Sequence, residues 1–200
     1  MIGALPYALL AKGAYHRARD IDVGSFRARI DDSPLGKCLS IAGTDDIETA
    51  LTDIEALVPI FAREIEAWVP GSFLKAVTGA MAEIQTIRQF PPIRVLLGHS
   101  LGGVLAILTG ACLCAAGLPP KAIFAFAPPR SSVGNRLTAL FATHGVTLQL
   151  YRLGEDVVPN LPPGFDHPVP LGQLGRANSL LGDHDLDHII AALQVAEVSA

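Results

Sequence analysis

The sequence has few charged residues and no cluster of basic ones. Charged side chains make up 17% of its 200 residues, and the formal net charge is −4. Nucleic acid is therefore not an expected partner. Internal repeats and low-complexity tracts are also absent, and half of the residues are hydrophobic. These features exclude a disordered chain and predict a single domain over residues 1–200 with a sizeable core.

Cysteine is scarce, and its number is odd. Cys38, Cys112 and Cys114 are the three cysteines, and none has the spacing typical of metal ligands. The N-terminal segment has no basic residue before its apolar stretch and contains Pro6, which argues against a secretory signal. We therefore predict a cytoplasmic protein with buried, reduced thiols and no metal or other cofactor.

One long uncharged stretch raises the possibility of a membrane span. Residues 95–120 contain no lysine, arginine, aspartate or glutamate, which is long enough to cross a bilayer. They also contain GHSLGG and end in GLPP, so a strand, a turn and a buried helix explain them better. We predict no transmembrane span and at most a transient contact with a lipid surface.

Apolar strands alternate with helices along most of the chain. Strands are predicted at residues 25–30, 37–41, 93–98, 121–127 and 146–153, and helices at residues 4–19, 46–68 with a break near Pro59, 72–88, 101–117, 132–144 and 183–195. This alternation predicts an α/β fold with a mostly parallel central sheet and helices on both faces. Functional residues of such sheets gather at the carboxyl ends of the strands.

The segment VLLGHSLGG, residues 95–103, places Ser100 between glycines, after an apolar strand and before an apolar helix. G-x-S-x-G in this setting is typical of a nucleophile elbow, a sharp turn that presents the serine hydroxyl at its tip. The turn brings strand and helix close together, so the positions of Gly98 and Gly102 must be small. The pattern also arises by chance, and the residues downstream must support it.

A serine nucleophile needs a base and a group that orients the base. Glu155 and Asp156 follow a predicted strand in YRLGEDVVPNLPP, and His167, His184 and His188 come later. This order, serine then acid then histidine, is the one that the fold requires.

An oxyanion hole needs two hydrogen-bond donors. The amide of Leu101, directly after the serine, is one candidate. Thr44 in CLSIAGTDD offers an N–H and a hydroxyl, and Gly43 before it permits close approach.

Several separated blocks resemble the class 3 (fungal-type) lipases, which have the α/β-hydrolase fold. The blocks are LSIAGT, VPGSFLKA, VLLGHSLGG, FAFAPPRSSVGN, GEDVVPNLPP and GDHDLDHIIAAL, in the family's order over about residues 4 to 193. The resemblance implies Ser100 as nucleophile, Asp156 as orienting acid and His184 as general base. It also implies Thr44 and Leu101 as the oxyanion donors.

Three alternatives to these assignments stay open. Glu155 is the rival of Asp156, and His188, one helical turn after His184, is the rival base. The acidic and histidine cluster at 183–188 has a spacing that suits a metal site, although Asp183 is more simply a helix N-cap. Residues 45–58 match the position of the family's lid, and an ordinary surface helix explains them equally well.

These patterns predict a serine hydrolase that cleaves carboxylic esters through an acyl-enzyme. The expected substrate is a small-molecule acyl ester or a lipid, such as an acylglycerol or another fatty-acyl ester. A thioesterase or acyltransferase could use the same triad. A hydrolase fold without catalysis, acting as a binding protein, is the alternative from another class.

Overall fold

The central sheet has seven strands, and five of them run parallel. The computed structural model describes residues 3–16, 18–44, 54, 57–87, 92–175 and 179–198. Strands β3, β6, β7, β8 and β9 pair in parallel, β2 pairs antiparallel with β3, and β1 pairs antiparallel with β2. The predicted mostly parallel sheet is therefore confirmed. In spatial order the strands are β1 Ile21–Val23, β2 Phe26–Ser33, β3 Gly36–Ile41, β6 Val95–His99, β7 Ala122–Phe126, β8 Thr147–Leu153 and β9 Gly172–Leu174.

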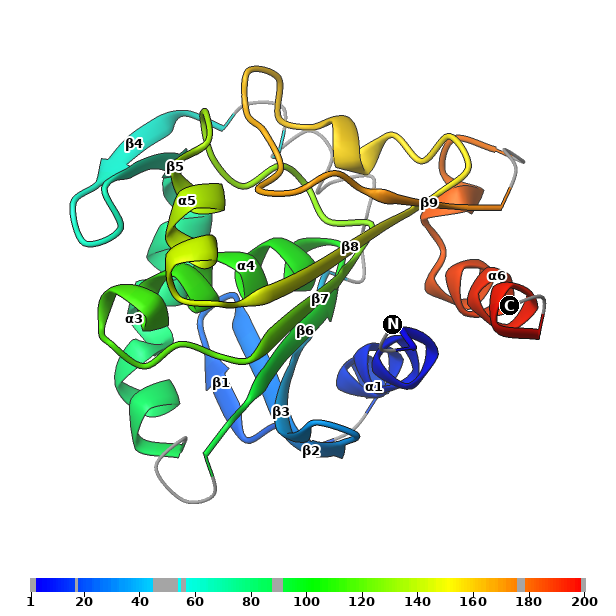
Figure 1. The fold of residues 1–200 in the computed structure, drawn as a ribbon, viewed down its shortest axis with the longest axis horizontal. Helices are drawn as coiled ribbons and strands as arrows, with labels where there is room; N and C mark the ends of the chain where they lie inside the picture. Colours follow the sequence, from blue (N-terminus) through cyan, green and yellow to red (C-terminus); the bar gives the residue numbers. More distant parts are fainter. Residues whose placement is uncertain are drawn as a thin grey trace.

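Helices cover both faces of the sheet, as predicted (Figure 1). Helices α1 and α6 lie side by side against one face, and α3, α4 and α5 lie against the other. Their bounds are α1 Leu5–His16, α3 Gly71–Ile87, α4 Leu101–Ala115, α5 Arg136–Thr143 and α6 Leu186–Val198. The carboxyl ends of the parallel strands meet at one edge, so the loops that follow them are neighbours.

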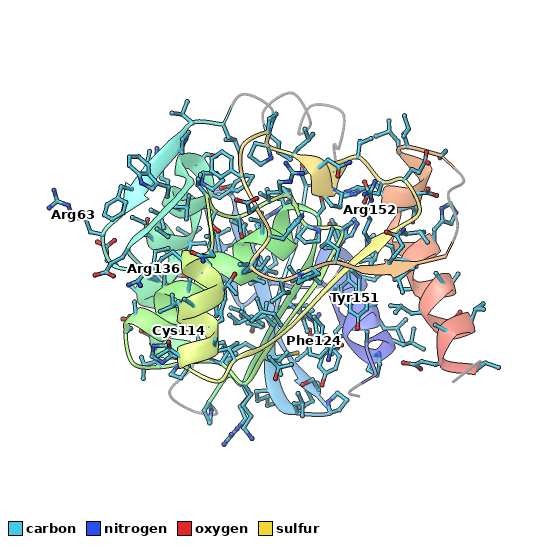
Figure 2. The ribbon with its side chains drawn as sticks, turned by 45° about the horizontal axis from the view of Figure 1, so that its top comes forward. Arg63, Cys114, Phe124, Arg136, Tyr151 and Arg152 are labelled. Atoms are coloured by element: carbon cyan, nitrogen blue, oxygen red, sulfur yellow. The ribbon has the colours of Figure 1, made fainter. Side chains whose placement is uncertain are left out.

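Two hydrophobic cores, one on each side of the sheet, hold these layers together. The side chains of a strand alternate between the faces. Leu96 therefore joins the core under α3 and α4, whereas Leu97 joins the core under α1 and α6. On the α1 side Tyr7 stacks on Phe124, with ring centroids 3.7 Å apart. Figure 2 shows Phe124 and Tyr151 on this side of the sheet.

Helix α4 accounts for the long uncharged stretch. Twelve of its fifteen residues are buried, because it lies between the sheet on one side and α3 and α5 on the other. A helix that is apolar all round is expected in such a place. Within the described parts of the chain, no helix has the length and apolar character that crossing a membrane requires.

The predicted helix over residues 46–68 is wrong in its second half. Strands β4, Pro59–Ala62, and β5, Ala67–Pro70, form a two-stranded antiparallel sheet there. The charged residues between the two strands form the turn, and Glu66 adopts a φ of 50° there. In the sequence these residues have the pattern of an exposed helix surface, which explains the wrong prediction. Arg63 projects from this turn, away from the rest of the molecule (Figure 2). Residues 45–53, 55 and 56, most of the possible lid, lie outside the described residues.

The last helix begins three residues later than predicted. A 3-10 turn at Gly182–His184 precedes it, and Asp185 is extended. The Asp185 carboxylate accepts the N–H of Asp187 at 2.7 Å, so Asp185 is the N-cap instead of Asp183. This shift places His184 outside the helix. The other predicted helices and strands are present, with ends displaced by a few residues.

Candidate active site

Ser100 lies in a strained turn at the end of β6, the fourth of the seven strands in the sheet. Its φ of 54° and ψ of −128° are values that residues with a side chain rarely adopt. The Ser100 N–H donates to the Phe126 carbonyl at 2.9 Å, and the Ser100 carbonyl accepts the Gly103 N–H at 2.9 Å. The turn from strand to helix predicted for an elbow is therefore present.

Two glycines allow strand and helix to meet at this turn. A Cβ atom on Gly98 would lie 2.3 Å from the carbonyl carbon of Gly102, and a Cβ on Gly102 would lie 2.1 Å from the Ile41 carbonyl oxygen. Both distances are shorter than real Cβ contacts, and both involve backbone atoms that cannot move aside. The second contact shows that α4 also touches the end of β3.

Replacing Gly102 by alanine should therefore disrupt the elbow. The methyl group has to displace either α4 or β3, so we expect a fall in melting temperature. Gly79→Ala is the matched control, because Gly79 lies in α3 with nothing within 4 Å of its added Cβ. That change should stabilise the protein by about 0.5–1 kcal/mol. Equal melting temperatures for the two variants would contradict the close contact.

Asp156 and His184 form a buried pair beside the elbow. The His184 Nδ1–H donates to Asp156 Oδ2 at 2.8 Å, and both side chains are almost wholly buried. The other carboxylate oxygen of Asp156 accepts the Val158 N–H at 3.0 Å, which fixes the plane of the carboxylate. Glu155, its rival, is exposed.

His188 lies apart from this pair. It is exposed, and its Nδ1 donates to the Gly182 carbonyl at 2.8 Å. Asp183 is buried, and its carboxylate accepts the Glu155 N–H at 2.9 Å. It thereby joins the loop of His184 to the loop of Asp156, a role that the sequence did not reveal.

Two buried polar atoms near the elbow have no hydrogen-bond partner among the described residues. They are Oγ of Ser100 and Nε2 of His184. Because the His184 Nδ1 donates to Asp156, the Nε2 of a neutral ring is an acceptor. Most buried polar groups in folded proteins have a hydrogen-bond partner. An exception calls for an explanation, and a catalytic role is one.

His99, the residue before Ser100, connects the elbow to His184. Its Nε2–H donates to the His184 carbonyl at 2.8 Å, so in the neutral ring Nδ1 accepts the hydroxyl hydrogen of Tyr15 at 3.0 Å. The rings of His99 and His184 lie 4.7 Å apart. Burial, and then the repulsion from His184, lower the pKa of His99 to about 3, so that it remains neutral.

The depressed pKa of His99 predicts acid sensitivity. Between pH 6.5, the ordinary value, and about 3, the unfolded chain binds a proton that the folded protein does not. The free energy of unfolding should therefore fall as the pH decreases through this range, by up to about 1.4 kcal/mol per pH unit. Burial lowers the pKa of His167 as well, which adds to the effect.

Urea unfolding at about pH 7 and about pH 5 measures this dependence. His99→Gln keeps an amide donor for the His184 carbonyl but does not titrate, so its dependence should be shallower than that of the wild type. His188→Gln, an exposed control, should keep the wild-type slope. Identical slopes for His99→Gln and the wild type would contradict the argument. The other ionisable groups that line this region, Lys12, Tyr15, His16, His184, Asp185 and Asp187, are the same in all three proteins.

The predicted oxyanion loop lies against the elbow. A Cβ atom on Gly43 would lie 2.8 Å from the His99 carbonyl oxygen and 2.3 Å from the Tyr15 hydroxyl, so only glycine fits there. Thr44 follows and is half-buried. Leu101 is the first residue of α4, where backbone N–H groups have no partner within the helix. Both predicted donors are thus in segments that adjoin Ser100.

A cavity of about 330 Å³ adjoins His184. Helix α1 and the segment before α6 form its walls, and Lys12 and Asp187 form an ion pair of 2.5 Å at its exposed side. Ser100 does not line it. Its lining residues are Lys12, Tyr15, His16, Thr44, His99, Leu181, His184, Asp185, Leu186 and Asp187.

The remaining candidates lie away from this centre. His167 donates through Nε2 to the Pro159 carbonyl at 2.8 Å, whereas the hydrogen bond to the Asp156 carboxylate comes from His184. Burial raises the pKa of each of the three cysteines to about 11, so none is a thiolate at neutral pH. All three are free thiols; Cys38 and Cys114 are buried as predicted, whereas Cys112 is only partly buried. Over the described ranges, no group of three or more potential ligands could hold a metal ion.

Comparison with known structures identifies the fold. The lipase of Rhizomucor miehei, in a propeptide complex, superimposes with a TM-score of 0.70 over 86% of this chain and 68% of that chain, at 19% identity. A triacylglycerol lipase whose catalytic centre is a serine protease triad gives 0.69 over 86% and 79%, also at 19% identity. A central parallel sheet with an elbow after its middle strand is the α/β-hydrolase fold, which confirms the prediction.

The sequence comparison is more specific. The family model "Lipase (class 3)" matches residues 38–165, and the chain belongs to this family. The secreted mono- and diacylglycerol lipase 1 of Fusarium solani is 32% identical over 140 residues, which cover 66% of this chain and 38% of that protein. The chain spans just over a third of the length of the curated relatives it matches.

The same comparison corrects the predicted location. A cytoplasmic protein was expected, but the relative from Fusarium solani is a secreted lipase, which contradicts that expectation. The prediction depended on features that the sequence lacks, a basic N-terminal region and paired cysteines. Such absences do not report where a folded domain works, because unpaired and buried thiols are compatible with either environment.

Proposed function

We propose that this protein is a serine hydrolase that cleaves carboxylic esters of fatty acids, with acylglycerols as the substrate class. The observation that carries the proposal is the buried Asp156–His184 pair beside a strained elbow at Ser100. Membership of the class 3 lipases supports the substrate class. The mono- and diacylglycerol lipase from Fusarium solani supports the same choice.

In the proposed mechanism, His184 Nε2 takes the proton of the Ser100 hydroxyl, and Oγ attacks the ester carbonyl. Asp156 keeps the imidazole in the tautomer whose Nε2 is an acceptor, and stabilises the imidazolium that forms. The N–H groups of Leu101 and Thr44 stabilise the oxyanion. His184 then returns the proton to the leaving alcohol, and water releases the acid from Ser100 by the same steps.

Hydrolysis assays on the purified protein test this function. The substrates are p-nitrophenyl esters of increasing chain length, a monoacylglycerol, a diacylglycerol and an acyl thioester. We expect turnover of the oxygen esters, with kcat/KM highest for a medium or long acyl chain. A preference for the thioester, or transfer to an added alcohol, would overturn the ester hydrolase in favour of a thioesterase or acyltransferase. Tight binding without any turnover would favour a binding protein.

A further inference from the structure

Arg27 contacts the predicted oxyanion loop from the neighbouring strand. It lies on β2, and its Nη2 donates to the Gly43 carbonyl at 2.7 Å. The backbone of the same residue accepts the Ala42 N–H at 2.8 Å, which holds the side chain close to the loop. A charged donor makes stronger hydrogen bonds than a neutral one, and this bond is partly shielded from water.

The Gly43 carbonyl and the Thr44 N–H belong to one peptide unit. That unit is planar and trans, so the two groups point in opposite directions. Strand β3 lies between β2 and β6 (Figure 1). A carbonyl turned toward Arg27 on β2 therefore turns the Thr44 N–H toward β6, the strand that ends at Ser100.

The same peptide needs to be held because Gly43 permits other orientations. Glycine has access to a wider range of backbone angles than any other residue. The Tyr15 hydroxyl and the His99 carbonyl oxygen restrict the space around its α-carbon. The hydrogen bond from Arg27 to the Gly43 carbonyl holds this peptide in one orientation.

We propose that Arg27 is a positioning residue of the oxyanion hole, which orients the Thr44 N–H toward the carbonyl oxygen of the ester under attack. The proposal rests on the ester hydrolase function given above. It follows that loss of the guanidinium should weaken stabilisation of the oxyanion and leave binding of the planar substrate intact. Loss of an oxyanion donor costs about 10²–10³ in kcat, and a donor that is only misdirected should cost about 10- to 100-fold.

Arg27→Met tests the proposal, because methionine keeps an aliphatic stem of similar reach but has no donor. Arg29→Met is the matched control. Arg29 lies on the same strand and the same face, and binds Asp31 instead of the loop. The assay measures kcat and KM for a p-nitrophenyl ester, per active site titrated with a fluorophosphonate, and the inhibition constant of a trifluoromethyl ketone, which binds as an oxyanion.

We expect Arg27→Met to lose about 10- to 100-fold in kcat with little change in KM, and the affinity for the ketone to fall in parallel. Arg29→Met should lose thermal stability but keep its kcat per titrated site. In Arg27→Ala, added guanidinium ion at millimolar concentration should restore part of kcat. Wild-type kcat and ketone affinity in Arg27→Met would overturn this proposal alone. Absence of turnover and labelling in the wild type would overturn the proposed function as well.

Discussion

Ser100→Ala is expected to lower kcat for ester hydrolysis by about 10⁴- to 10⁶-fold, since it removes the hydroxyl that we propose forms the acyl-enzyme. The fold should tolerate the change. The Ser100 hydroxyl is buried without a partner among the described residues, so its removal breaks no hydrogen bond there. Alanine keeps the Cβ atom and with it the strain of the turn at φ 54°.

The melting temperature of Ser100→Ala should therefore equal or slightly exceed that of the wild type. A lower kcat with an unchanged melting temperature would show that the variant has lost its nucleophile and kept its fold. A variant that retains a tenth or more of the wild-type kcat would contradict the assignment of Ser100 as nucleophile.

Asp156→Asn is expected to lower kcat by about 10⁴-fold while the structure is kept. An asparagine can still accept the Val158 N–H through its oxygen, but its amide group cannot accept the Nδ1–H of His184. The imidazole would then favour the other tautomer, with its proton on Nε2, and would no longer accept from Ser100.

Glu155→Gln is the matched control for this change. Glu155 is adjacent in sequence, carries the same charge and is exposed. Its backbone N–H, which binds Asp183, is unaffected by the substitution. We expect kcat to stay within about twofold of the wild type, as for most surface substitutions. A large fall in kcat for Glu155→Gln, with wild-type kcat for Asp156→Asn, would contradict the assignment of Asp156 as the orienting acid.

The middle of the fold could be predicted because its residues admit few structures. Strands β6 and β7 are short apolar runs buried on both faces, and α4 is too apolar to lie anywhere but inside the core. The hairpin of β4 and β5 could not be predicted in this way. The charged residues of its turn have the pattern of a helix surface, and Trp68 of β5 pairs with Val133, which is distant in the sequence. The edge strands β1 and β9 have three residues each, which is too short for a periodic pattern.

The candidate site was predictable in its chain order and less so in its details. Spacing alone left Glu155 beside Asp156 and His188 beside His184. Burial and the Asp156–His184 hydrogen bond distinguish them in the structure.

Tyr15 and Arg27 were missed because their hydrogen-bond partners lie far along the chain or on the backbone. The Tyr15 partner is 84 residues away, and the Arg27 partner is a carbonyl group. Side-chain patterns in the sequence carry no signal for either contact. Asp183 was predicted to be a helix N-cap for the same reason. The backbone N–H that its carboxylate accepts belongs to Glu155, in a loop distant in the sequence.

Labelling with a fluorophosphonate tests the central claim most directly, because the reagent modifies only a serine that a base has activated. Intact mass and peptide mapping should show one label, on Ser100, in the wild type and in His188→Ala, and none in His184→Ala. Loss of the label in His188→Ala with retention in His184→Ala would contradict the assigned base. A wild-type protein that takes no label, even with detergent present, would contradict the account of this site as a serine hydrolase.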